Sequence, residues 1–222
     1  MNEGLFPEAL VSKIQKTGIV AVLVVDNAAD AVPLAETLLK AGINIMELTL
    51  RTPAAIESLK AIVKNAPEMA AGIGTILFPG QLEEVMGAGA AFGVAPGMNP
   101  NIVKMAADAK FPFAPGIATP SDIEAALGFG CRILKFFPAE SMGGLKHLEN
   151  MSAPYAHLNL KYIPLGGLNQ NNFAAYLKNP SVIAVGGSWL AKRDEISCRK
   201  WNVIADKAKR AVAAVKKARD EA

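Results

Sequence analysis

Short apolar segments rich in β-branched residues alternate with amphipathic segments of helical period along the chain. Short apolar runs bounded by turn residues are typical of buried strands, whereas apolar residues three and four apart indicate helices. The predicted strands cover residues 18–25, 44–50, 70–74, 92–95, 112–115, 132–136, 160–164 and 183–186. The predicted helices that follow them cover residues 28–40, 53–65, 79–88, 101–109, 120–127, 144–151, 169–177 and 198–219. One further amphipathic helix is predicted before the first strand, at residues 1–17.

This alternation restricts the fold to two architectures. Strands that alternate with helices pair in parallel and connect through right-handed crossovers, in either an open doubly wound sheet or a closed barrel. Eight strand–helix units, with no Gly-x-Gly-x-x-Gly motif after the first strand, favour the barrel. We therefore predict an α/β fold: a TIM (β/α)8 barrel at residues 18–222, with an additional N-terminal helix at residues 1–17, in one domain.

Local residue choices support several helix ends. Four of the predicted helices have a proline at or near their first turn, where a missing amide proton costs little. Thr119 and Asn169 are predicted N-caps. Gly42, Gly89 and Gly130 each follow a predicted helix, as expected of a C-terminal cap.

Composition narrows the class of protein. Of the 222 residues, 51% are hydrophobic, enough for a large core, and no segment approaches the length of a membrane span. Basic residues near the C-terminus are interspersed with acidic ones at helical spacing, which predicts a solvated helix and no nucleic-acid partner. Cys131 and Cys198 follow no redox spacing, and the N-terminal segment does not have the pattern of a signal peptide. We expect a cytoplasmic protein.

No cofactor is predicted. His147 and His157 lie outside the ends of the predicted strands, and no group of Asp, Glu and His has the spacing of metal ligands. We therefore expect no metal and no other cofactor.

The second predicted strand carries polar residues on the face that would point into the barrel. Strand side chains alternate between faces, so Glu47, Thr49 and Arg51 share one face while the apolar residues between them face the helices. Glu47 and Arg51 form either a structural ion pair or part of a functional site. The functional interpretation is favoured, because buried ion pairs seldom stabilise a fold better than apolar packing.

The sixth predicted strand carries one lysine, Lys135, among bulky apolar neighbours. Burial would disfavour the ammonium form, and a neutral amine is the nucleophile that attacks a ketone to form an imine. Alternatively, Lys135 extends to the barrel rim or pairs with Glu47 in a purely structural role.

Glycines mark the ends of other strands. The third strand ends at Gly74, followed by Thr75, whose hydroxyl can bind a carboxylate or cap the next helix. The last two strands are followed by Gly166–Gly167 and by Gly187 with Ser188. Barrels often bind phosphate between these two loops, although paired glycines also occur in ordinary turns.

The chain resembles the 2-keto-3-deoxy-6-phosphogluconate (KDPG) and 4-hydroxy-2-oxoglutarate (KHG) aldolases, which are class I aldolases of the Entner–Doudoroff type. The resemblance extends from about residue 18 to residue 189. Its most specific segments are Glu-Leu-Thr-Leu-Arg-Thr at 47–52 and Lys-Phe-Phe-Pro-Ala-Glu at 135–140. The other matching segments lie at residues 74–77, 95–97, 166–167 and 186–189.

The resemblance implies a role for each matched residue. Lys135 would form a Schiff base with the keto acid, and Glu47 would act as general acid and base. Arg51 and Thr75 would bind the carboxylate of the pyruvate part. Pro96 and Phe137 would line the pocket. The phosphate of the aldehyde part would be bound by Gly166, Gly167, Gly187 and Ser188.

The resemblance also implies the products and the assembly. KDPG would be cleaved to pyruvate and glyceraldehyde 3-phosphate, and KHG to pyruvate and glyoxylate, without a metal. A homotrimer is expected, and the small-molecule partner is a keto acid with a phosphorylated aldehyde portion.

One residue departs from the family pattern. Many relatives have threonine before the Gly-Gly pair, where this chain has Leu165, which offers no hydrogen bond to the aldehyde portion. The chain is therefore expected either to use the family's usual substrates or to act on a different sugar-derived 2-keto acid. A phosphate-binding isomerase is a weaker alternative, because it gives Lys135 no task. A non-catalytic binding barrel is also weaker, because Lys135, Glu47 and Arg51 are all present.

Overall fold

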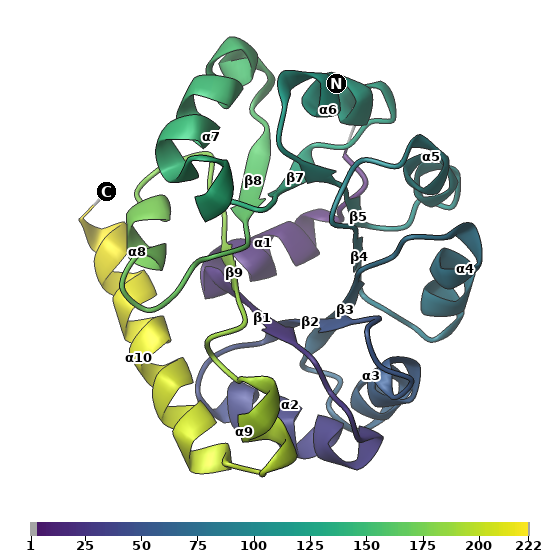
Figure 1. Ribbon diagram of the computed structural model, residues 1–222, viewed down its shortest axis with the longest axis vertical. Coiled ribbons are helices and arrows are strands. Elements are labelled where there is room, and N and C mark those ends of the chain that lie inside the picture. The colour runs from purple at the N-terminus through teal and green to yellow at the C-terminus, as the bar shows by residue number, and fades with distance from the viewer. Residues whose placement is uncertain (1–3, 222) are drawn as a thin grey trace.

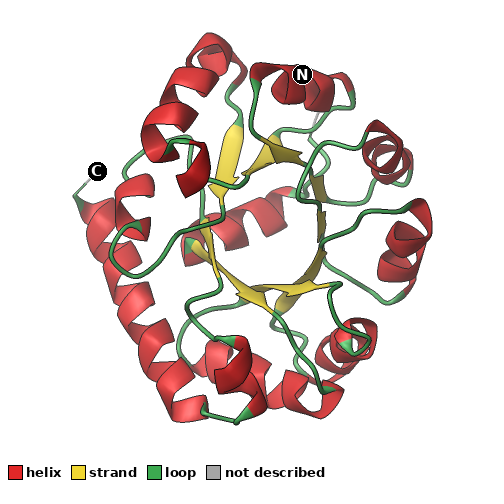
Figure 2. Cartoon of the chain, in the orientation of Figure 1, coloured by secondary structure: helices red, strands yellow, loops and turns green. Residues whose placement is uncertain are grey.

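The computed structural model describes residues 4–221 and forms a (β/α)8 barrel, with a ring of strands surrounded by helices (Figures 1 and 2). All strand pairs in it are parallel. The strands are β1 (Ile19–Leu23), β2 (Ile45–Thr49), β3 (Ala70–Gly74), β4 (Gly93–Val94), β5 (Phe113–Ala114), β6 (Gly116–Ile117), β7 (Ile133–Phe136), β8 (Lys161–Pro164) and β9 (Val185–Gly187). The predicted barrel is confirmed.

The ring closes through two hydrogen-bonded sheets. One has the order β5-β4-β3-β2-β1-β9 and the other the order β6-β7-β8. The strand predicted at residues 112–115 contains β5, whereas β6 lies beyond its predicted end. Pro115 separates the two strands because proline has no amide proton to donate to a ladder. A bridge between Tyr162 and Val182 joins β8 to the segment that leads into β9.

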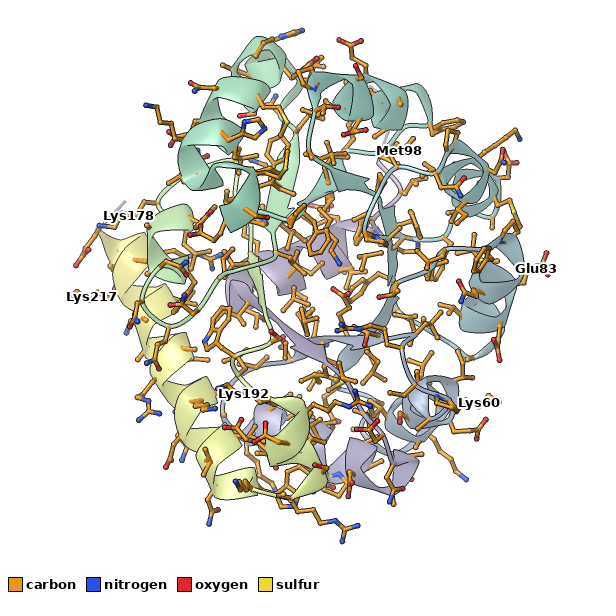
Figure 3. All side chains as sticks on the ribbon, in the orientation of Figure 1. Lys60, Glu83, Met98, Lys178, Lys192 and Lys217 are labelled. Atoms are coloured by element: carbon orange, nitrogen blue, oxygen red, sulfur yellow. The ribbon has the colours of Figure 1, made fainter. Side chains whose placement is uncertain are left out.

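The outer layer contains most of the helices. They are α2 (Ala31–Lys40), α3 (Ala55–Asn65), α4 (Pro79–Gly87), α5 (Pro100–Asp108), α6 (Pro120–Gly128), α7 (Gly144–Ser152), α8 (Phe173–Tyr176), α9 (Arg193–Ser197) and α10 (Trp201–Asp220). Short 3-10 turns, η1 (Ala28–Asp30), η2 (Glu140–Met142) and η3 (Ala153–Leu158), accompany them. Charged side chains such as Lys60, Glu83 and Lys217 point outward from this layer (Figure 3).

Some predicted helix ends are confirmed and others are wrong. Thr119 caps α6 and accepts a hydrogen bond from the Asp122 amide. Asn169 does not cap α8, because its side chain accepts from Asn171 in a local turn and the helix begins only at Phe173. The last helix, predicted at residues 198–219, corresponds to α10 but begins at Trp201, because Arg199 adopts a left-handed backbone (φ 53°) that a right-handed helix cannot contain. Helix α9, just before it, was not predicted.

Two apolar cores hold the barrel together. One lies between the strands and the outer helices, and the other lies inside the ring. Helix α1 (Glu8–Thr17) crosses behind the ring (Figure 1), and its Ile14, only 1% exposed, belongs to the inner core together with Val20 and Ile45. The N-terminal helix therefore covers the end of the barrel where the strands begin. Residues 1–3 of the predicted helix lie outside the described residues.

Within residues 4–221, no helix combines the length and the apolar character needed to cross a membrane.

Candidate active site

Strands β2 and β7 bring one acid and one amine together inside the barrel. Glu47 is 2% exposed and Lys135 is 6% exposed. The Lys135 Nζ donates to Glu47 Oε1 at 3.2 Å, so the two side chains form a buried ion pair across the ring. The predicted inward orientation of both residues is confirmed. It follows from strand alternation, which places Ile45 of β2 and Ile133 of β7 in the same inner core.

Gly74 makes room for the acid. A Cβ atom built on this residue of β3 would overlap the Glu47 carboxylate. Glycine is thus required here by a neighbouring side chain, since the carboxylate occupies the space that any other residue at position 74 would fill. The close approach at Gly74 is thus made by a catalytic candidate.

Of the two ion pairs considered from the sequence, Glu47–Arg51 and Lys135–Glu47, the structure forms the second. Arg51 is exposed at the barrel mouth, and its Nε donates to Thr49 Oγ1 at 3.2 Å. Thr49 in turn donates to the backbone oxygen of Leu23 at 3.2 Å. Glu47 pairs with Lys135 and not with Arg51, which leaves the guanidinium at the cavity entrance.

Thr75 has an unusual backbone. Its φ is 66°, in the left-handed region that β-branched residues rarely adopt. Strain of this kind persists only where the surrounding structure imposes it, and it concentrates at functional sites. The strained backbone presents the partly exposed Thr75 at the cavity wall, next to the strand that accommodates Glu47.

These residues surround a cavity of about 270 Å³ at the carboxyl ends of the strands. Apart from Gly187, all the predicted site residues line it: Glu47, Arg51, Thr75, Pro96, Lys135, Phe137, Gly166, Gly167 and Ser188. Gly187 is instead covered by the Trp189 ring, which a Cβ at that position would overlap. Gly186 lines the cavity in its place.

Leu165 also lines this cavity, and Gly186 makes room for it. A Cβ built on Gly186 would overlap the Leu165 side chain. Val22 and Leu168 are further lining residues that the sequence analysis did not identify. Alternation along β1 could have indicated Val22, whereas Leu168 follows a turn and carries no periodic signal.

The charges of the cavity favour an anionic ligand. Its charged lining residues are Glu47, Lys135 and Arg51, which leaves one positive charge in excess when all three are ionised. The Lys135 Nζ also lies 5.4 Å from the centre of the Phe137 ring, within range of a cation–π interaction. A carboxylate or phosphate would therefore gain charge-assisted hydrogen bonds here.

The Lys135–Glu47 pair is suited to nucleophilic and acid–base chemistry. Transfer of one proton across the 3.2 Å contact gives a neutral amine and a neutral carboxylic acid together. The first can attack a carbonyl carbon, and the second can protonate a departing oxygen. Across residues 4–221, the structure brings together no group of three or more His, Cys, Asp or Glu side chains placed to hold a metal ion.

A larger cavity, of about 380 Å³, lies at the amino ends of β8 and β9, and Glu149, Lys161 and Tyr162 are among its lining residues. Barrel enzymes place their reactive groups at the carboxyl ends of the strands. The smaller cavity, which contains Lys135, is therefore the candidate active site.

The sequence and the fold are both similar to known proteins. Residues 10–207 match the model of the family "Aldolase: KDPG and KHG aldolase". A 2-dehydro-3-deoxy-phosphogluconate aldolase of Haemophilus influenzae is 39% identical over 197 residues, which cover 89% of this chain and 92% of the relative.

Solved structures give the same result. KDPG aldolase from Legionella pneumophila, with pyruvate captured as a covalent carbinolamine intermediate, aligns with a TM-score of 0.85 and 35% identity. That alignment covers 90% of this chain and 96% of the other. The Zymomonas mobilis KDPG aldolase with 3-phosphoglycerate aligns with a TM-score of 0.83 and 37% identity, over 91% of this chain and 94% of the other.

Proposed function

The chain belongs to the KDPG and KHG aldolase family, and from this premise we propose that Lys135 forms the Schiff base and Glu47 moves the protons of its reaction. The protein is a class I aldolase, a carbon–carbon lyase that cleaves KDPG, KHG or both. The observation that carries the residue assignment is the buried 3.2 Å contact between the Lys135 amine and the Glu47 carboxylate.

The proposed cycle begins with imine formation. The neutral Lys135 amine attacks the C2 carbonyl carbon of the keto acid and forms a carbinolamine. Glu47 protonates the C2 hydroxyl, which leaves as water and gives a protonated imine. The carbinolamine form of pyruvate in the Legionella relative supports this step for the family.

Carbon–carbon cleavage follows from the electron demand of the imine. A base, Glu47 directly or through a water, removes the proton of the C4 hydroxyl. The C3–C4 bonding electrons then move toward the imine nitrogen, which leaves an aldehyde and an enamine on Lys135. Protonation of the enamine at C3 and addition of water release pyruvate and regenerate the amine. The water lost in the first stage is returned in the last.

The remaining lining residues would bind the two ends of the substrate. Arg51 and Thr75 are proposed to bind the carboxylate of the pyruvate part, because both lie at the cavity wall next to the Lys135–Glu47 pair. Gly166, Gly167 and Ser188 are proposed to bind the phosphate of the aldehyde part. The 3-phosphoglycerate in the Zymomonas relative supports a phosphorylated three-carbon ligand for the family.

Borohydride trapping tests the lysine assignment. Reduction in the presence of pyruvate should add the mass of a reduced pyruvate imine to the peptide that contains Lys135. The Lys135→Ala variant should show no adduct and no aldolase activity. Lys161→Ala is the matched control, because that lysine is partly exposed at the amino end of β8, away from the cavity that contains Lys135. This variant should keep both the pyruvate adduct and the aldolase activity.

Glu47→Gln separates binding from proton transfer. The amide can still accept a hydrogen bond from Lys135 but cannot act as a general acid, so kcat should fall by roughly 100-fold or more. Pyruvate should still bind and raise the thermal unfolding temperature of the variant. Unchanged turnover in Glu47→Gln would remove Glu47 from the mechanism, and an adduct at another lysine would remove Lys135.

Leu165 favours a second candidate substrate. It lies in the cavity wall beside Gly166 and offers only apolar contacts where a hydroxyl is expected. A different sugar-derived 2-keto acid, less dependent on a hydrogen bond at that position, is therefore proposed as an alternative to KDPG.

A coupled assay of pyruvate release across phosphorylated and non-phosphorylated keto acids distinguishes these candidates. If Leu165 sets the preference, Leu165→Thr should raise kcat/KM for KDPG by about tenfold, the effect of one hydrogen bond. An unchanged ratio between substrates would assign the preference elsewhere.

We also propose a homotrimer located in the cytoplasm. Family membership supports the trimer, and the free thiols of Cys131 and Cys198 are compatible with a reducing compartment. Light scattering coupled to size-exclusion chromatography should give a mass of three chains, and a monomer mass would contradict the proposal.

A further inference from the structure

Two residues outside the cavity lining, Glu140 and Tyr176, hydrogen-bond next to the Gly166–Gly167 loop. Glu140 begins η2, the first helical turn after the strand that carries Lys135, and Tyr176 ends α8, the first helix after the glycine loop. The Tyr176 hydroxyl donates to Glu140 Oε1. Tyr176 is 2% exposed, so this hydrogen bond is anchored in the core at one end.

We propose that Tyr176 and Glu140 are positioning residues that hold the Gly166–Gly167 loop in the conformation that binds the substrate phosphate. This inference rests on the proposed role of that loop in phosphate binding. Neither side chain is assigned a contact with the reacting atoms, so neither is a catalytic residue.

Glu140 contacts the loop through its backbone and its side chain. Its amide donates to the backbone oxygen of Gly166 at 3.0 Å, and the neighbouring Ala139 amide donates to that of Leu165 at 2.7 Å. A Cβ built on Gly167 would lie 2.6 Å from the Glu140 Cβ, which shows that the two backbones approach closely. Any displacement of Glu140 is therefore transmitted to the loop.

The two glycines of the loop have no side chains of their own to hold its shape. Gly166 and Gly167 both adopt positive φ, at 97° and 80°, and they carry no side chains that could pack. Glycine is the residue with the largest conformational entropy to lose, so a loop of two glycines must be ordered by its surroundings. On one side the surroundings are the backbone amides at the start of η2. On the other side they are the Asn169 and Asn172 side chains before α8, which donate to the Gly167 oxygen at 3.4 and 3.3 Å. The Tyr176–Glu140 hydrogen bond connects η2 and α8.

The donor at Tyr176 remains protonated over the working pH range. Burial and the hydrogen bond to Glu140 both raise the pKa of Tyr176 above its usual value of 10.0. The exposed Glu140 carboxylate would otherwise be free to turn toward the loop, where its negative charge would repel a phosphate. Tyr176 thus fixes both the loop backbone and the direction of this charge.

Tyr176→Phe tests the inference because it removes only the hydroxyl. The KM for KDPG should rise about three- to tenfold, the effect of one lost hydrogen bond on loop order, while kcat is unchanged. The KM for non-phosphorylated KHG should not change. The inhibition constant of inorganic phosphate, used as a competitive probe of the loop, should rise by the same factor as the KM for KDPG.

A control and two companion variants complete the design. Tyr155→Phe removes a hydroxyl that donates to Glu124 at 2.9 Å, away from the loop, and should leave every constant unchanged. Glu140→Gln retains an acceptor for Tyr176 and should behave more like the parent protein than Glu140→Ala does. The double variant with Tyr176→Phe and Glu140→Ala should be no worse than Glu140→Ala alone, since both changes break one interaction.

Equal changes in the constants for both substrates, or an unchanged phosphate inhibition constant in Tyr176→Phe and Glu140→Ala, would overturn the inference. Trapping of pyruvate on Lys135 in each variant keeps this outcome separate from the proposed function. A parent protein that is not trapped contradicts the proposed function, whereas trapped variants without the phosphate effect contradict only the positioning role.

Discussion

At the scale of single residues, the reactive pair depends on a residue that has no side chain. Lys135 and Glu47 meet only because position 74 leaves a space that the carboxylate occupies. The site is therefore specified by a close approach between neighbouring strands as much as by its two charged groups.

Gly74→Ala should displace the Glu47 carboxylate without altering any charge. Overpacking should destabilise the fold by about 1–3 kcal/mol. Loss of a positioned acid should lower kcat on the order of 100-fold. Steady-state kinetics and urea unfolding measure the two effects. Gly80→Ala is the matched control, because a Cβ there meets no atom within 4 Å, and its activity should equal that of the parent protein. A fully active Gly74→Ala would show that the acid does not need its present position.

Strand alternation was sufficient to predict the orientation of the key side chains, but not their contacts. It placed Glu47 and Lys135 inside the barrel, but it did not decide between Arg51 on the same strand and Lys135, 88 residues away on another strand, as the partner of Glu47. The strained φ of Thr75 and the covering of Gly187 by Trp189 are set by tertiary packing. Neither leaves a periodic signal in the sequence.

At the scale of secondary structure elements, α1 has a distinct task. Its apolar residues do not join the outer helical layer but extend the inner core, so this helix closes the barrel at the amino ends of the strands.

Ile14→Ala should therefore destabilise the barrel although α1 precedes it in sequence. Loss of a fully buried side chain at this position should lower the free energy of unfolding by about 2–5 kcal/mol. Gln15→Ala, an exposed neighbour on the same helix, should change it by less than about 0.5 kcal/mol. Urea denaturation followed by circular dichroism measures both. Similar midpoints for the two variants would mean that α1 does not contribute to the inner core.

Element boundaries were predicted best where the sequence carries local signals. The strand at residues 70–74 and the cap at Thr119 agree with the structure. The short strand β6 after Pro115 and the short helix α9 before Arg199 were not predicted. Both are too short to show a periodic pattern of their own, so periodicity alone cannot detect them.

At the scale of the whole molecule, alternation left two architectures open, and ring closure decides between them. Pairing of β1 with both β2 and β9 brings the first and last strands together. Because this contact joins the two ends of the chain, we expect the barrel to unfold as one unit. That residues 1–222 form one domain stays a prediction.

The two cysteines provide a test of that prediction. Cys131 is 1% exposed and burial raises its pKa to about 12, so its thiol should not react with iodoacetamide near pH 8 in the folded protein. Cys198 is exposed and should react at once. With increasing urea, labelling of Cys131, followed by mass spectrometry, should coincide with the loss of circular dichroism. Labelling of Cys131 at lower urea would reveal a part of the barrel that opens independently.

Because α1 closes one end of the barrel, the ligands should bind and leave in a fixed order. With α1 closing one end, the cavity around Lys135 communicates with solvent at the carboxyl ends of the strands, where Arg51 is exposed. If Lys135 forms the imine as proposed, the pyruvate fragment is held at the buried lysine, and the fragment released by cleavage lies nearer the entrance. The aldehyde should then depart first and pyruvate last. In the reverse direction pyruvate must arrive first, so synthesis should follow an ordered sequence of binding.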